Sequence, residues 1–325
     1  MAFLERDYAE FSERRPSAAR MGKRLSLDEK TVRVRVRRME ESGFVKYYQA
    51  SPSLALFGLR HVSLFRLEAL NLATKFAVIR GLDGVSRLVE SSDFLGPSMT
   101  VSVAGATPEE ARAEADRLAA HYELGTTMIG DRAIAPPSSG MDLLDWKIIK
   151  ALRYDAKSGD TALAEALSVT QRMVGYRVSK LLGSGAIRIR AVIDPKMQAG
   201  LVFYELEIHT EADRQRSISR WLNERYGSRL WQMASPTVGV LLASLFCFTL
   251  AEPEESVVEA LSQRGVKRCT PFVLKEVIEP KRPNWIDSLI DFRIASQTKE
   301  QGARRPGGRA STRPALYEPV FRRGS

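Results

Sequence analysis

The stretches EKTVRVRVRRMEESGFVKYY (residues 29–48) and QRMVGYRVSKLLGSGAIRIR (residues 171–190) decide the fold, because they are two versions of one pattern. They align without a gap at an offset of 142 residues. The identical pairs at this offset include Ser26 and Ser168, Val32 and Val174, Arg35 and Arg177, Val36 and Val178, Gly43 and Gly185, and Gly58 and Gly200. A single unshifted register of this kind predicts an internal duplication.

The second copy predicts a helix-turn-helix followed by a strand. Residues 141–156 carry apolar side chains at the spacing of one helical face, and residues 161–167 suit a short second helix. Thr170 is placed to cap a third helix that begins at Gln171. The third helix has one apolar face, formed by Val174, Val178 and Leu181. The alternating segment 186–194 predicts an edge strand that serves as the wing of a winged helix-turn-helix.

The opposite face of this third helix is the candidate DNA contact of the second copy. It carries Arg172, Tyr176 and Lys180, and Gln171 lies in the first turn, from which side chains reach base edges. Arg177 lies at the flank of the packed face, where a hydrogen bond within the domain and a phosphate contact are equally expected.

The first copy repeats this pattern with a more basic third helix. Asp28 is its expected N-cap, and the period-two run VRVRVRR argues for a strand. We favour a helix, because Val32, Val36 and Met39 have the spacing of one helical face. The side chains expected to contact DNA are Lys30, Thr31, Arg33, Arg37 and Arg38. Met1 aligns with Leu143, so the sequence leaves room only for a degenerate first helix.

We call each copy of the helix-turn-helix with its following strand a head. Each head is followed by a segment that is predicted to form a strand, a helix, two strands, a helix and a strand, the order of a ferredoxin-like βαββαβ domain. The expected fold class is therefore α+β, with two winged helix-turn-helix heads each followed by a ferredoxin-like domain. The expected divisions are a first head at 1–58, a first ferredoxin-like domain at 59–133, a linker at 134–140, a second head at 141–200, a second ferredoxin-like domain at 201–280, and a basic helix with a disordered tail at 281–325.

Charge follows the same alternation. The chain carries a formal net charge of +10. Residues 14–60 hold a net +8 and residues 61–133 a net −3, whereas residues 141–200 hold +4 and residues 201–280 hold −2. Basic heads alternating with acidic domains indicate a polyanionic partner that meets the heads. We therefore expect double-stranded DNA as the partner.

The combination resembles the Lrp/AsnC family of transcription regulators, which join a helix-turn-helix head to a βαββαβ ligand-sensing (RAM) domain. The likeness rests on Leu144, Asp145, Ile148 and Ile149, on Leu163 and Ala164, on Val174, Arg177, Val178 and Leu181, and on Gly185, Asp194, Pro195 and Gly200. The resemblance implies a sequence-specific DNA-binding transcription regulator. Because family members carry one unit per chain and pair as dimers, two units in one chain imply a covalent pseudo-dimer.

Two features depart from the family pattern. The Gly-x-x-Asp pattern typical of amino-acid sensors in this family is missing from both SSDFLGPSM and ASPTVGVLL, so the small-molecule effector stays open. The basic tail, rich in Gly, Pro and Arg, is extra. The resemblance also implies pairing of chains through the ferredoxin-like domains. One alternative is a partner protein that does not bind DNA and modulates true family members.

A second alternative is an enzyme, since siroheme decarboxylases resemble two fused units of this architecture. Such catalysis would use His and Arg side chains around a tetrapyrrole, whereas the three histidines, His61, His121 and His209, lie at strand or helix ends without a His-rich motif. We therefore expect no catalytic residues, no cofactor and no enzyme activity. Cys247 and Cys269 lack metal-ligand spacing, so no metal is expected. The sequence shows no membrane span and no signal peptide, which favours the cytoplasm.

Overall fold

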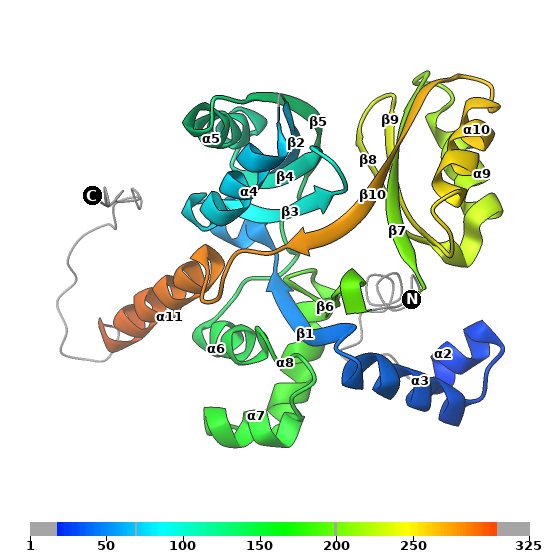
Figure 1. The fold of residues 1–325 in the computed structure, drawn as a ribbon. Helices are drawn as coiled ribbons and strands as arrows, with labels where there is room; N and C mark the ends of the chain where they lie inside the picture. The colour runs from blue at the N-terminus through cyan, green and yellow to red at the C-terminus, as the bar shows by residue number, and fades with distance from the viewer. Residues whose placement is uncertain (1–17, 69, 198–199, 304–325) are drawn as a thin grey trace.

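The computed structural model describes residues 18–303, except for 69 and 198–199. The expected first helix of the first copy and the expected tail lie outside the described residues. Two groups of helices sit on one side of a small two-stranded sheet, and a large sheet lies on its other side (Figure 1). Helices α4 and α5 cover one end of the large sheet, and α9 and α10 cover the other (Figure 1). The chain is therefore a mixed α/β protein with a helix-turn-helix and an antiparallel sheet covered by helices.

The helix-turn-helix comprises α6 (Leu143–Leu152), α7 (Asp160–Leu167) and α8 (Gln171–Gly183). α6 begins with a capping box, in which Asp142 and Asp145 each accept a hydrogen bond from the other's backbone N–H. Thr170 caps α8 as expected, since its side chain accepts from the backbone N–H of Met173. Val174, Val178 and Leu181 are buried, so the predicted packed face is confirmed.

The corresponding N-terminal region contains α2 (Ala18–Leu25) and α3 (Glu29–Glu41). The VRVRVRR run is helical, so the prediction of a helix over a strand is confirmed, and Asp28 is its N-cap. The apolar spacing prevails over β-branching because Val32 is buried in the core while Val34 is left exposed.

The strands that follow the two helical groups pair with each other. β1 (Val45–Pro52) and β6 (Ile187–Ile193) form an antiparallel two-stranded sheet, called the wing sheet below. Short 3-10 turns follow each strand, at Leu54–Phe57 and Pro195–Met197. Each strand thus supplies the partner for the other's ladder, and one hydrophobic core joins the two helical groups.

The large sheet has eight strands in the order β5-β2-β4-β3-β10-β7-β9-β8. Its first half is built from β2 (His61–Glu68), α4 (Leu72–Gly81), β3 (Leu88–Phe94), β4 (Met99–Gly105), α5 (Pro108–His121) and β5 (Gly125–Ala133), with a 3-10 turn at Leu82–Gly84. Its second half is built from β7 (Val202–Thr210), α9 (Gln215–Tyr226), a 3-10 turn at Gly227–Arg229, β8 (Leu230–Thr237), β9 (Val240–Cys247), α10 (Glu252–Leu261) and β10 (Val266–Ile278). Both halves show the same order of elements and of strands.

The long strand β10 joins the halves (Figure 1). Its first part pairs with β7, and its end pairs with β3. The helices pack against separate cores on the outer faces of the two halves. The inner faces meet around Ile129, Val240 and Leu242. The last helix, α11 (Trp285–Ala303), lies along α6 (Figure 1).

Three general features bear on function. In the described part of the chain, no helix is both long and apolar enough to cross a membrane. The same residues contain no group of three or more metal-ligating side chains. Cys247 and Cys269 are free and buried, as small apolar residues are.

Candidate functional site

The outward face of α8 carries three of the four side chains expected to contact DNA in this segment. Gln171 and Arg172 are exposed in the first turn, and the Tyr176 ring is 68% exposed one turn later. A large aromatic side chain this exposed on a capped helix is a natural contact for a macromolecular partner. The capped, packed helix therefore offers a rigid polar surface.

Lys180, the fourth candidate, turns back toward α6. Its Nζ lies 3.6 Å from Asp145 Oδ2 and 3.3 Å from the Gly140 carbonyl oxygen. Arg177 bonds to Asp142, and its Nη1 lies 3.1 Å from Asp145 Oδ1. The Asp145 carboxylate is fully buried and balanced by these two cations. Arg177 therefore holds α8 against α6, and Lys180 shares in that contact.

The outward face of α3 is denser in positive charge. Lys30, Arg33, Arg37 and Arg38 are all exposed. Arg33 is paired along the helix with Glu29. Thr31 is half-buried, and both its backbone N–H and its hydroxyl donate to the Asp28 carboxylate, so this side chain belongs to the cap. Three of the exposed cations are thus free of ion pairs within the described residues.

A polar seam between the inner sheet faces was missed by sequence reasoning. Arg66 of β2 bonds to Glu207 of β7 at 2.5 Å and stacks on the Phe272 ring. The Glu207 carboxylate also pairs with the side chains of Arg268 and His209. Burial raises the pKa of the neighbouring Glu205 carboxyl to about 7, although Arg66 acts in the opposite direction.

The sequence did contain a signal for this seam. Glu205, Glu207 and His209 alternate with apolar residues in β7, which places all three on one face of the strand. When charged side chains lie on the face of a strand that its helices do not cover, they need polar partners on the layer that they meet.

The other two histidines lie apart from this seam. His61 pairs with Asp131 at 2.7 Å, and His121 lies at the end of α5 against the Tyr122 ring.

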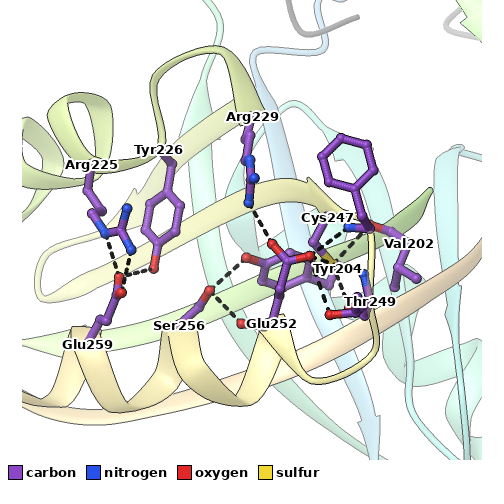
Figure 2. Close-up of polar contacts among 11 residues, drawn as sticks. Val202, Tyr204, Arg225, Tyr226, Arg229, Cys247, Thr249, Glu252, Ser256 and Glu259 are labelled. Carbon is purple, nitrogen blue, oxygen red and sulfur yellow. Dashed lines mark hydrogen bonds and ion pairs between the residues drawn. The ribbon is translucent and has the colours of Figure 1, made fainter. Parts of the chain in front are cut away.

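A polar pocket of about 340 Å³ lies between α9 and α10 (Figure 2). Arg225 forms an ion pair with Glu259, and Arg229 forms one with Glu252, so these charged side chains of the lining pair with one another. On its floor the Tyr204 hydroxyl lies 2.8 Å from the Ser256 hydroxyl, which donates to the Glu252 carbonyl oxygen. Burial raises the pKa of Tyr204 to about 12. These groups satisfy one another, and the network ties α9 to α10.

Comparison with known proteins supports a helix-turn-helix in one part of the chain. Residues 141–182 match the model of the AsnC-type helix-turn-helix domain. This range contains α6, α7 and α8 in full except for the last residue of α8. The matched residues do not include α2 and α3, so a second head is not shown. A search among curated proteins gave no match.

Solved structures extend the likeness to nearly the whole chain. The siroheme decarboxylase NirDL, solved in complex with an iron-uroporphyrin III analogue, has a TM-score of 0.53 at 11% identity, covering 88% of this chain and 95% of that one. A second structure of NirDL gives a TM-score of 0.54 at 9% identity, covering 91% and 98%. E. coli AsnC is similar over 42% of this chain and 92% of its own, with a TM-score of 0.35 and 16% identity.

These matches correct one expectation. The sequence led us to expect no enzyme, because it showed no familiar catalytic grouping. That prediction is wrong, since the fold shared over nearly the whole length is that of an enzyme. The expectation rested on the lack of a recognisable motif in the sequence, whereas the likeness that overturns it lies in the fold. The chain therefore combines an AsnC-type helix-turn-helix with a fold found in a decarboxylase.

Proposed function

We propose that the chain is a sequence-specific DNA-binding transcription regulator whose principal reading element is α8. The observation that supports this most is an N-capped helix, inside an AsnC-type helix-turn-helix, that exposes Gln171, Arg172 and Tyr176 on one face. Side chains from the first turns of such a helix enter the major groove, where arginine reads guanine and glutamine reads adenine. Lys180 would contribute to phosphate binding by exchanging its long contact with Asp145 for a phosphate oxygen.

The proposal includes α3 as a second, unlike reading helix. Lys30, Arg33, Arg37 and Arg38 would make mainly phosphate contacts, with Thr31 at the helix start. In support, α3 has the same length as α8, a side-chain N-cap at the matching position, a serine C-cap and a following strand, and the wing sheet ties both helices to one core. The two units would then act as a covalent pseudo-dimer, in which each ferredoxin-like, RAM-like half of the large sheet belongs to one head.

The test is fluorescence anisotropy of the full chain with genomic DNA fragments over a salt series. The double variant Arg172→Ala/Tyr176→Ala should lose sequence preference. The matched control is Arg216→Ala/Arg220→Ala, which removes two exposed cations from α9 on the large sheet. Equal binding by all three proteins would overturn the proposal, and absence of binding would favour a partner protein that does not contact DNA.

A second candidate function, decarboxylation of a tetrapyrrole acid, is favoured by the nearly full-length likeness to NirDL. The seam between the sheets supplies suitable groups: Arg66 and Arg268 for a carboxylate, and Glu205 for proton transfer. Decarboxylation requires a proton at the carbon that loses CO2, and a carboxyl with a pKa near 7 can donate it. DNA binding and such a reaction are compatible in one chain.

Anaerobic incubation with siroheme, followed by mass spectrometry, tests this candidate. Loss of mass equal to CO2, which Glu205→Gln slows and Glu211→Gln leaves unchanged, would support it; Glu211 is an exposed carboxylate at the end of β7. Unaltered siroheme under conditions in which the same preparation binds DNA would remove it.

A further inference from the structure

The polar pocket between α9 and α10 contains two carboxylates whose hydrogen-bonding positions are taken (Figure 2). Glu259 accepts from Arg225 Nε at 2.8 Å and from the Tyr226 hydroxyl at 3.1 Å. Glu252 pairs with Arg229 at 2.6 Å and also accepts from two backbone N–H groups of the loop before α10. Both carboxylates are therefore compensated within the protein.

A third carboxylate of the pocket lacks such compensation. Glu255 follows Glu252 by three residues in α10 and lines the same pocket. Its side chain forms no hydrogen bond or ion pair with any residue that the structure describes. The lining carries three carboxylates and two guanidinium groups, which leaves one negative charge in excess. A ligand that complements this charge is a cation.

The floor of the pocket leaves a second acceptor free. The Ser256 hydroxyl donates to the Glu252 carbonyl oxygen at 2.9 Å, so it can only accept from the Tyr204 hydroxyl, 2.8 Å away. Burial raises the pKa of Tyr204 to about 12, so this hydroxyl keeps its proton at neutral pH and donates it to Ser256.

The oxygen of this hydroxyl is buried without a donor of its own. Tyr204 is 3% exposed, and its Oη accepts no hydrogen bond from the described part of the chain. The two groups of the pocket that remain unsatisfied, Glu255 and Tyr204 Oη, are thus both acceptors. A ligand that donates hydrogen bonds would satisfy them.

We propose that this pocket binds a small organic cation with a primary ammonium group, which donates hydrogen bonds to Glu255 and to Tyr204 Oη. An ammonium group suits these partners because it has three N–H donors, no acceptor and a positive charge. The volume of about 340 Å³ is that of a small ligand pocket. The bound cation would contact both helices and so hold α9 and α10 together.

This site goes beyond both candidate functions and is independent of them. Tyr204 and Glu205 are neighbours in β7, so their side chains lie on opposite faces of the strand. The pocket therefore opens on the outer face of the sheet, away from the seam that contains Arg66 and Glu207. The helices proposed to contact DNA contribute no residue to its lining.

The test is isothermal titration calorimetry of the full chain with n-butylammonium chloride, at an ionic strength held constant with sodium chloride. We expect saturable binding of one butylammonium ion per chain. Glu255→Gln should weaken it by about tenfold or more, because it removes the uncompensated charge. Tyr204→Phe keeps the ring and removes the buried acceptor, so it should weaken binding by about fivefold. Tetramethylammonium has the same charge but no N–H donor, and it should not bind saturably.

Glu254→Gln is the matched control, since Glu254 is an exposed neighbour in α10 that does not line the pocket, and it should bind as the unaltered chain does. Thermal unfolding of each variant without ligand checks that it folds, and Glu255→Gln changes only an exposed side chain. The proposal is overturned if butylammonium does not bind saturably, or if Glu255→Gln and Glu254→Gln bind it alike. Equal binding of tetramethylammonium would also overturn it, because the site would then recognise charge without hydrogen bonds.

Discussion

Arg35 and Arg177 occupy the same position of the repeated pattern, yet they do different things. Arg177 is 23% exposed and bonds to Asp142 and Asp145 at the start of α6. Arg35 is exposed, and no carboxylate pairs with it within the described residues. The sequence explains why, since the position that corresponds to Asp145 is Phe3. The arginine at this position therefore holds two helices together in the second copy, whereas in the first copy it remains exposed and can contact an anionic partner.

The two helical groups also differ in what holds them. α11 packs along α6, where Asp287 accepts hydrogen bonds from Arg153 and Tyr154, and Asp291 pairs with Lys150. α3 is held by fewer polar contacts, in which Glu40 accepts hydrogen bonds from the Tyr48 hydroxyl and from the Lys157 ammonium group. The second group is thus built for a fixed orientation, and the first carries more free charge. This contrast suits one helix that reads bases and one that mainly holds phosphates.

The largest expected effect on this contrast comes from Asp145→Ala. It removes a buried carboxylate that balances Arg177 and Lys180 and caps α6, so the free energy of unfolding should fall by about 3 kcal/mol. Urea unfolding followed by circular dichroism measures it. Asp155→Ala, an exposed carboxylate in the following loop, is the control and should change stability little. Equal effects from the two variants would refute the role given to Asp145.

Arg37→Ala/Arg38→Ala probes the free charge of α3. We expect DNA affinity to fall by about thirtyfold at moderate salt, with a salt slope smaller by roughly 2, because two phosphate contacts are lost. The Arg216→Ala/Arg220→Ala protein is again the control. An unchanged salt slope would mean that α3 does not lie on the DNA.

Arg35→Ala and Arg177→Ala test the comparison itself. Arg177→Ala should lower the free energy of unfolding by about 2 kcal/mol, because the buried Asp145 carboxylate is then balanced only by Lys180, at the longer distance. Arg35→Ala should leave stability within roughly 0.5 kcal/mol and lower the salt slope of DNA binding by about 0.9. If both variants act on stability alone, the two positions have the same role.

The smallest effect is expected at the helix caps. Thr170→Ala and Asp28→Ala should each cost about 1 kcal/mol, because each leaves a backbone N–H of the first turn without its acceptor. Thr170→Ser keeps the acceptor and should be close to neutral. Thermal unfolding compares the three proteins, and a Thr170→Ser variant as unstable as Thr170→Ala would show that the cap hydrogen bond is not the cause.

The local features of the fold followed from the sequence, and the distant ones did not. Thr170 and Asp28 were predicted as caps because capping depends on neighbours three residues away. The pairing of β1 with β6, and of β3 with β10, joins residues far apart in the chain, and no local pattern specifies it. The same limit hid the contact between Arg66 and Glu207. Lys180 was placed on the outward face by its spacing, but its long side chain reaches back to Asp145.

The most direct test of the central claim is selection of preferred sites from random DNA by the full chain, repeated with the Arg172→Ala/Tyr176→Ala and Arg37→Ala/Arg38→Ala variants. If α8 and α3 are unlike reading helices, the selected site has two unlike half-sites about one helical turn apart, or a multiple of it. The α8 variant then loses one half-site, whereas the α3 variant keeps both at lower affinity. A symmetric palindrome, or an unaltered chain that selects no sequence, would contradict the account.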